Sequence, residues 1–419
     1  MIQYNILLIS FLVFFLISSF SRWSLTRINV AHLRKFGHNV PEVFKGEIDS
    51  ETLARMTDYT VDSSRVGSFA SFADDIVLLL ILLSGFLPWY VNIIFSCKLN
   101  FVLSGLIFFA APALIGFIVK IPFNLYSTFV IEKNYGFSTI SMKLWIADLI
   151  KNLIISVVIG GILLGSFLVL IHFAKTTWWL WGWFLFASFQ LLILWLYPIL
   201  IAPLFNKYEP VRDQDLKDKI ISIMGKAGLK IKGVYQIDAG RRSKHTNAYF
   251  TGLGKTKRIV LYDTLLASHS GDEILSVLAH EAGHWKKKHI IKQLAVIEAL
   301  SFFVFFIAYY LINWSFMYQT FGFDQNISYV GLFLLSALFK PISFFFTPFM
   351  SVISRKFEVE ADTYSNQLTG STKHLSSALK RLAKDNLANL YPHPLYAWFY
   401  YSHPPLIDRI GYLQRMEDN

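Results

Sequence analysis

Residues 178–205 read WWLWGWFLFASFQLLILWLYPILIAPLF, a run of 28 residues without a charged side chain. An α-helix rises 1.5 Å per residue, so this run exceeds the roughly 20 residues that cross a hydrocarbon layer of about 30 Å. Six further predominantly apolar runs lie at 4–20, 76–95, 101–119, 152–173, 293–312 and 329–353. We therefore predict an α-helical integral membrane protein with seven transmembrane helices.

The basic residues are distributed unevenly among the loops between these spans. All of the 39 Lys and Arg residues except Lys98, Lys175 and Lys340 lie in the loops of one side or in the C-terminal tail. The positive-inside rule places those loops in the cytoplasm, at a bacterial inner membrane or at the endoplasmic reticulum of a eukaryote. The net charge of +11 then follows from topology, and we predict no nucleic-acid partner. The one cysteine, Cys97, excludes an intramolecular disulfide and a cysteine-based metal cluster.

Two polar regions interrupt the apolar pattern. β-branched and aromatic residues predict strands in the first of them, the last two paired as a hairpin, at 233–238, 247–252 and 257–263. A helix should begin near Ser270 to Glu273, where Ser and Asp can cap it. In the second region we predict one helix over 371–390 and another after the HPP sequence at 403–405.

The sequence SVLAHEAGHWKKKH, residues 276–289, contains an HExxH motif. His280 and His284 are four residues apart and share one helix face, so both imidazoles can bind one Zn²⁺. Glu281 is placed to take a proton from water beside the metal rather than to bind the metal. If the helix continues, His289 falls on the opposite face and is not a ligand. Ile290 stands where the metzincin pattern has its third histidine.

A third protein ligand must then come from elsewhere in the chain. The sequence SRKFEVEADTYS, residues 354–365, offers Glu358 and Asp362 on one helix face, with Glu360 pointing away. Glu358 would complete the ligand set, and Asp362 would accept the free N–H of a ligand histidine. The alternative for this segment is a solvated helix below the seventh span.

Seven stretches, in order along the chain, are similar to the CAAX prenyl endopeptidases of the Ste24 type, in zinc metalloprotease family M48. They are PFNLYSTFVIEKNYGFS (122–138), YPILIAPLFNKYEP (197–210), RSKHTNAYF (242–250), KRIVLYDTLL (257–266), HEAGHWKKKH (280–289), ISRKFEVEAD (353–362) and YSHPPLIDRI (401–410). The resemblance implies seven spans that enclose a hydrophilic chamber, with a cytoplasmic, mainly helical metalloprotease domain that carries a small β-sheet. It also implies one bound zinc ion, held by His280, His284 and Glu358.

The same resemblance implies roles for residues that the pattern alone does not distinguish. Glu281 would be the catalytic base, and His403 and Arg409 would line the active site near the scissile bond. From the sequence alone, His403 is equally well explained as a helix cap or core residue, and His393 could equally well be the active-site histidine. The strand Asn247, Ala248, Tyr249 and Phe250 would run beside the substrate, because an extended peptide can add to an open sheet edge; the alternative is an ordinary strand with Tyr249 and Phe250 in the core.

The predicted domain organisation has four parts. They are a membrane region with five spans (1–205), a catalytic region with HExxH (206–292), spans six and seven (293–353) and a second catalytic region with the third ligand (354–419).

The predicted function is a zinc-dependent membrane endopeptidase that cleaves near the C-terminus of prenylated or other membrane-associated peptides, with membrane lipid as a further partner. Two alternatives remain at this point. One is an HtpX-like protease that removes damaged membrane proteins. The other is a transporter with a metal-binding gate, whose ligands should lie near the bilayer midplane.

Overall fold

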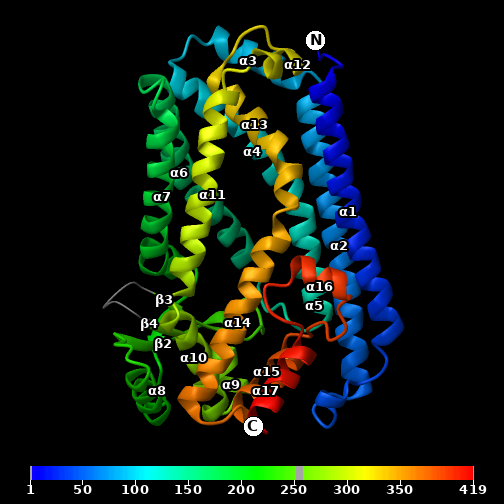
Figure 1. Cartoon of the computed structure of the whole chain (residues 1–419), viewed down its shortest axis with the longest axis vertical. Helices are drawn as coiled ribbons and strands as arrows, with labels where there is room; N and C mark the ends of the chain where they lie inside the picture. Colours follow the sequence, from blue (N-terminus) through cyan, green and yellow to red (C-terminus); the bar gives the residue numbers. More distant parts are fainter. Residues whose placement is uncertain (1, 252–257, 419) are drawn as a thin grey trace.

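The computed structural model describes residues 2–251 and 258–418. Long helices run along the long axis of the molecule, and the sheet and several shorter helices gather at the end that holds the C-terminus (Figure 1). The N-terminus lies at the opposite end.

Six helices among the described residues are long and apolar enough to cross a membrane. These six candidate spans are built on α1 (Ile6–Phe36), α2 (Ser50–Leu83), α4 (Phe101–Tyr126), α6 (Met142–Phe173), α7 (Trp178–Leu196) and α11 (His289–Leu311). A seventh span is a bent pair, α13 (Ser328–Phe344) and α14 (Thr347–Thr369), with an angle of 56° between the two helices. The predicted helical membrane architecture is confirmed.

These spans leave most of their apolar surface outside the protein core. In the most apolar window of α11 no residue is buried, and in that of the span from Trp178 to Leu204 only 6% of the residues are buried. Exposed apolar side chains at this density need a non-aqueous surrounding. The observed surface therefore requires lipid around the helices.

The second span differs from the predicted run at 76–95. Helix α2 ends at Leu83, and Gly85 adopts a φ of 80°, which glycine reaches without steric cost. The apolar residues beyond it form a separate helix, α3 (Phe86–Ser96). In the other direction α2 extends back to Ser50, capped by Asp49, as one helix of 34 residues.

The sheet has the strand order β1–β2–β4–β3. Its strands are β1 (Tyr208–Pro210), β2 (Gly233–Ile237), β3 (Ala248–Thr251) and β4 (Arg258–Tyr262). Strands β3 and β4 pair antiparallel, which confirms the predicted hairpin pairing, whereas β2 and β4 pair parallel. The turn at 253–256 lies outside the described residues. The three-residue β1 was not predicted, and β3 forms one edge of the sheet.

Helices surround the sheet and complete this part of the fold. The predicted helix after the hairpin is α10 (Gly271–Lys286), which begins with a capping box between Ser270 and Glu273. The two predicted C-terminal helices correspond to α15 (Lys373–Asp385) and α17 (Leu406–Glu417), and α16 (Pro394–Tyr400) was not predicted. The remaining short elements are α5 (Glu132–Asn134), α8 (Gln214–Lys226), α9 (Asp263–Ser268), α12 (Ser315–Thr320), π-helical turns at Ser127–Ile131 and Tyr197–Ile201, and 3₁₀ turns at Glu42–Phe44, Ala202–Leu204 and Ala239–Arg241.

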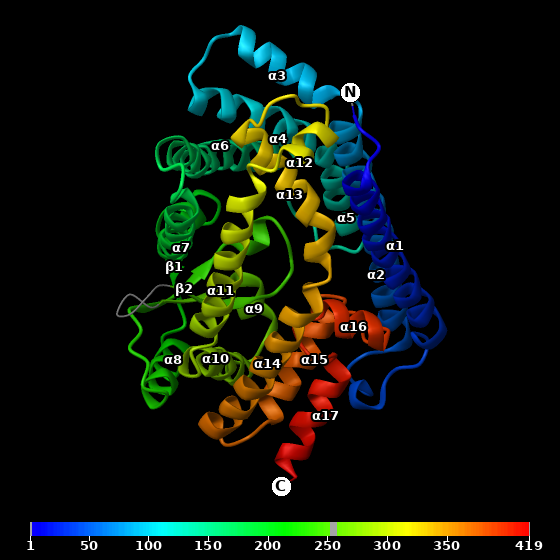
Figure 2. The same cartoon turned by 45° about the horizontal axis from the view of Figure 1, so that its top comes forward.

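A close helix contact fixes α10 against α14. A Cβ atom at Gly283 would lie 2.9 Å from the Cα atom of Ala361, a distance that real Cβ contacts do not reach. Only glycine at this position lets the two backbones approach so closely. The contact brings the HExxH helix and the helix of Glu358 side by side, as the turned view also shows (Figure 2).

A cavity of about 630 Å³, lined by both polar and apolar side chains, lies where α4 and α6 meet the loop before β3. Asn124, Asn152 and Arg242 are among the side chains that line it, so Asn152 faces a cavity as an intramembrane polar group is expected to. An enclosed chamber of the full predicted extent stays a prediction.

Candidate active site

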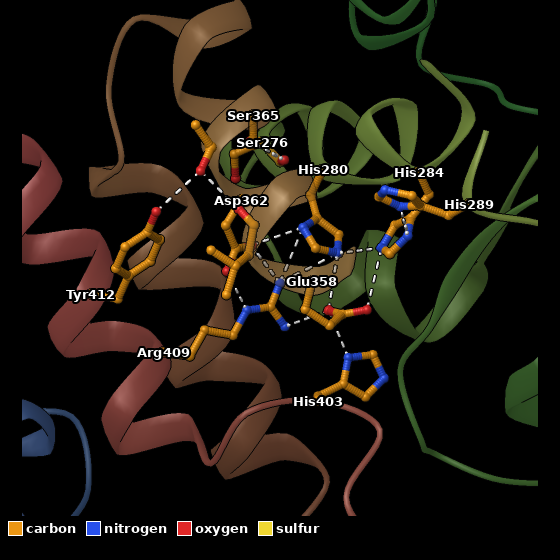
Figure 3. Close-up of polar contacts among 12 residues, drawn as sticks. Ser276, His280, His284, His289, Glu358, Asp362, Ser365, His403, Arg409 and Tyr412 are labelled. Atoms are coloured by element: carbon orange, nitrogen blue, oxygen red, sulfur yellow. Dashed lines mark hydrogen bonds and ion pairs between the residues drawn. The ribbon is translucent and has the colours of Figure 1, made fainter. Parts of the chain in front are cut away.

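Three side chains from two helices converge at the centre of the site. The Nε2 atoms of His280 and His284 on α10 are 3.2 Å apart. Each also faces Glu358 on α14, with 3.4 Å from His280 Nε2 to Oε2 and 3.3 Å from His284 Nε2 to Oε1 (Figure 3). His280 and Glu358 are buried, and His284 is half-buried. The structure thus brings together the residues that were predicted as a ligand set.

The spacing of these atoms fits a tetrahedral zinc site. Zinc binds histidine nitrogen and carboxylate oxygen at about 2.0–2.2 Å, so two ligand atoms on neighbouring corners of a tetrahedron lie about 3.4 Å apart. The two Nε2 atoms, 3.2 Å apart, agree with this value, and each faces a different oxygen of Glu358, so that one ligand atom from each of the three side chains lies within 4.8 Å of the others. Two imidazoles and one carboxylate also form a donor set that is typical of catalytic zinc, in which the fourth position stays open.

Asp362 and Arg409 support the back of the ligand set. Asp362 Oδ1 lies 2.8 Å from His280 Nδ1, the ring nitrogen that faces away from the other two ligands. The guanidinium of Arg409 donates two bonds to the same carboxylate, at 2.7 and 2.8 Å, and its Nη1 lies 3.4 Å from Glu358. All of these groups are buried, so their charges interact strongly.

The electrostatic balance at His280 favours positive charge. Burial and the nearby Arg409 oppose protonation, but hydrogen bonds to Asp362 and Glu358 outweigh them and raise the pKa of His280 to about 9. The two carboxylates therefore stabilise a cation at the imidazole pair.

The structure corrects the expectation for His289. Helix α10 ends at Lys286, and Lys288 adopts a φ of 57°, so the chain turns before α11 begins at His289. His289 Nδ1 then lies 3.0 Å from His284 Nδ1, and His289 Nε2 lies 3.1 Å from Glu360. His289 therefore contacts the ring nitrogen of His284 that does not face Glu358, and it does not lie on the opposite face of a continued helix. The sequence offers no glycine or asparagine as a signal for this left-handed turn.

His403 and His393, which the sequence alone left equivalent, lie in different places. His403 Nδ1 is 2.7 Å from Glu358 Oε2, and 61% of the His403 side chain is exposed. His393 caps α16 and packs its ring edge-on against His32. Glu281 follows His280 on α10, is half-buried and interacts electrostatically with Arg409.

The candidate substrate strand lies next to the HExxH helix. Strand β3 contacts α10, and the Phe250 ring lies 6.5 Å from that of Trp285. Tyr249 and Phe250 are half-buried, and Ala248 is buried. Asn247 precedes the strand, and its Oδ1 accepts from the Ala248 backbone N–H. In the order of the described strands β3 is an edge, so one row of its backbone groups faces away from the sheet.

Comparisons with known proteins match almost the whole chain. The profile "CAAX prenyl protease N-terminal, five membrane helices" covers residues 29–207, and "Peptidase family M48" covers residues 210–417. The CAAX prenyl protease 1 homolog of Arabidopsis thaliana is 33% identical over 380 residues, which cover 88% of this chain and 89% of that protein.

The chain belongs to peptidase family M48. The CAAX prenyl protease 1 of Saccharomyces cerevisiae is also 33% identical, over 90% of this chain and 89% of the yeast protein. The crystal structure of S. mikatae Ste24p matches with a TM-score of 0.91 at 31% identity and covers 98% of this chain and all of that one.

Membership in family M48, together with the membrane-spanning helices, makes this protein an integral membrane metalloendopeptidase that acts on peptides or proteins. The predicted family and enzyme class are confirmed. The HtpX-like and transporter alternatives are not favoured, because the match includes the five-helix N-terminal membrane region of CAAX prenyl proteases.

Proposed function

We propose that this M48 member binds one Zn²⁺ through His280, His284 and Glu358 and uses it to hydrolyse peptide bonds. The observation that carries the proposal is the convergence of one ligand atom from each of these three side chains within 4.8 Å, with the two imidazole nitrogens 3.2 Å apart. When bound, zinc would supply Lewis-acid polarisation of the scissile carbonyl and lower the pKa of water.

The protein's own groups then have distinct roles. Glu281 neighbours a ligand on α10 without belonging to the ligand cluster, so we assign it as the base that takes a proton from the attacking water. His403 is largely exposed at the edge of the ligand set and is placed to donate to the developing oxyanion. Arg409 is buried beneath the carboxylates, and we assign it a positioning role through Asp362 and Glu358 rather than direct contact with substrate.

The substrate binds, in this proposal, as an extended strand along β3, with Asn247, Ala248, Tyr249 and Phe250 as its neighbours. Backbone hydrogen bonds to a sheet edge make few demands on side chains, which suits an endopeptidase. We further propose that the substrates carry prenylated CAAX-type C-termini, which the names of the relatives support. The asymmetry of the basic residues supports a cytoplasmic location of the site.

One experiment tests metal, reaction and lipid selectivity together. The purified full-length protein is incubated with a farnesylated CAAX peptide and with its unprenylated twin, each with and without a zinc chelator. We expect chelator-sensitive cleavage of the farnesylated peptide and much slower cleavage of the twin. Equal rates on both peptides would reject the prenyl requirement, and cleavage that resists the chelator and zinc depletion would reject the metal mechanism.

The Glu281→Gln variant separates the base from the ligands. Because the amide keeps the shape of the side chain and cannot accept the proton, we expect loss of turnover with a zinc content equal to that of the wild type. Zinc content is measured by elemental mass spectrometry on the same preparation. Retained turnover would refute the assignment of Glu281.

A further inference from the structure

Helices α1 and α2 form a groove between them that the active site does not use. The two helices lie side by side along one edge of the molecule (Figure 1). The groove between them has a volume of about 750 Å³. Its lining includes the apolar or aromatic side chains of Leu16, Phe20 and Trp23 and the guanidinium groups of Arg27, Arg34 and Arg65.

Three arginines give one end of this groove a strong positive charge. Arg27, Arg34 and Arg65 are all exposed, and none forms an ion pair with a described residue. The lining includes no acidic side chain among the described residues. Arg22 on the same helix behaves differently, because it pairs with the buried Asp75. The three groove arginines are therefore available to an external anion.

Apolar and aromatic side chains form the rest of the groove. Leu16, Phe20, Phe69 and Phe72 are more than half exposed, and Arg27 lies over the ring of Trp23 at 5.1 Å. Leu16 and Arg27 are separated along α1 by about 16 Å at the helical rise, which is close to half of a hydrocarbon core of about 30 Å. The groove thus runs from the depth of lipid chains to the depth of headgroups within one leaflet.

We propose that this groove binds an anionic phospholipid of the membrane. The guanidinium groups of Arg27, Arg34 and Arg65 would hold the headgroup phosphate with charge-assisted hydrogen bonds. One acyl chain would lie along Leu16, Phe20 and Phe72. Charge complementarity selects the anionic class, and the apolar continuation into the membrane selects a lipid over a free phosphate. Tryptophan at the boundary between the two parts is typical of the membrane interface.

Native mass spectrometry of the delipidated full-length protein tests the proposal. Phosphatidylglycerol and phosphatidylcholine with identical acyl chains are titrated separately, and the affinity of the first bound lipid is compared. We expect the wild type to prefer phosphatidylglycerol by at least about tenfold, since each basic residue at the surface contributes a few-fold in affinity. The variant Arg27→Ala/Arg34→Ala/Arg65→Ala should lose this preference.

A matched control removes the same charge from other membrane-flanking positions. Lys133→Ala/Lys143→Ala/Lys207→Ala alters three exposed basic residues outside the groove and should keep the wild-type preference. If the groove and control variants lose the preference equally, or if neither loses it, the proposal is wrong. If the groove variant does not fold, Arg65→Gln alone should weaken phosphatidylglycerol binding by about fivefold.

Two further arms distinguish a lipid from other occupants. Phe20→Ala/Phe72→Ala should weaken phosphatidylglycerol binding, and unchanged binding would show that no acyl chain occupies the groove. Inorganic phosphate in large excess should leave the lipid bound, and full displacement would identify a simple anion site. If a protein copurifies at the groove and excludes phosphatidylglycerol from the wild type, the surface is a protein interface and the proposal fails.

Discussion

Asp362→Asn is the change that most directly tests how the ligand set is held. The amide has the shape of the carboxylate, so an oxygen can still accept from His280 Nδ1, 2.8 Å away. The other terminal atom becomes an NH₂ group that faces the guanidinium of Arg409. Both groups are hydrogen-bond donors, so the bond from Arg409 Nε is lost. The buried arginine then keeps its charge without one of the two carboxylates that balance it.

The expected losses follow from these contacts. A hydrogen bond between charged groups contributes about 1.5–3 kcal/mol, so losing one of the two from Arg409 should lower the free energy of unfolding by about 2 kcal/mol. A carboxylate that accepts the free ring N–H of a metal-binding histidine raises metal affinity by about 10- to 100-fold. The uncompensated positive charge beside His280 acts in the same direction, because it disfavours a cation at the imidazole pair.

The assay measures zinc affinity by competition with a chromophoric chelator and stability by thermal unfolding of the full-length protein. The exposed residue Asp324 supplies a control, Asp324→Asn, that should match the wild type in both measurements. Activity of Asp362→Asn should return as free zinc rises, since the proposed base Glu281 is untouched. A folded Asp362→Asn variant with zinc affinity within about threefold of the wild type would refute the reasoning.

Three other changes test neighbouring features. His289→Ala should free the rear of the His284 ring and weaken zinc binding by about tenfold, measured with the same chelator, whereas His393→Ala should not. Gly283→Ala should lower stability by about 1–3 kcal/mol, because its Cβ atom would press on Ala361; Gly225→Ala, which meets open space, should leave thermal unfolding unchanged or raise its midpoint. Burial lowers the pKa of His245, but hydrogen bonds to Glu132 and Asn386 outweigh burial and raise it. The protonated His245 should therefore stabilise the fold fully below about pH 6.5, the ordinary pKa of histidine, and this stabilisation should be lost as pH rises through the raised pKa. Glu132→Gln should flatten this part of the unfolding profile, and an unchanged slope would contradict the pairing.

Much of the architecture was predictable because it depends on local patterns. A long uncharged apolar run is most stable in the membrane interior, so its position can be predicted from the run alone. The four-residue spacing of His280 and His284 likewise places both side chains on one face of any helix. The capping box of Ser270 and Glu273 is equally local. These features need no knowledge of distant contacts.

The parts that were not predicted depend on distant partners or on unusual backbone. The middle of α2 is polar in sequence, but its Asp75 is neutralised by Arg22 and Lys340 from two other helices, so the helix continues through it. The apolar run at 329–353 conceals the 56° bend between α13 and α14. The left-handed turn at Lys288, which returns His289 to the site, carries no glycine or asparagine signal.

The ligand cluster is assembled from segments on either side of the last two membrane spans. His280 and His284 precede α11, whereas Glu358 follows α13. During translation the histidine pair therefore emerges well before its carboxylate partner, and His403 and Arg409 follow later still. The proposed zinc site is thus incomplete in a nascent chain until α14 has been synthesised, so a chain that has only reached α10 has no proteolytic activity.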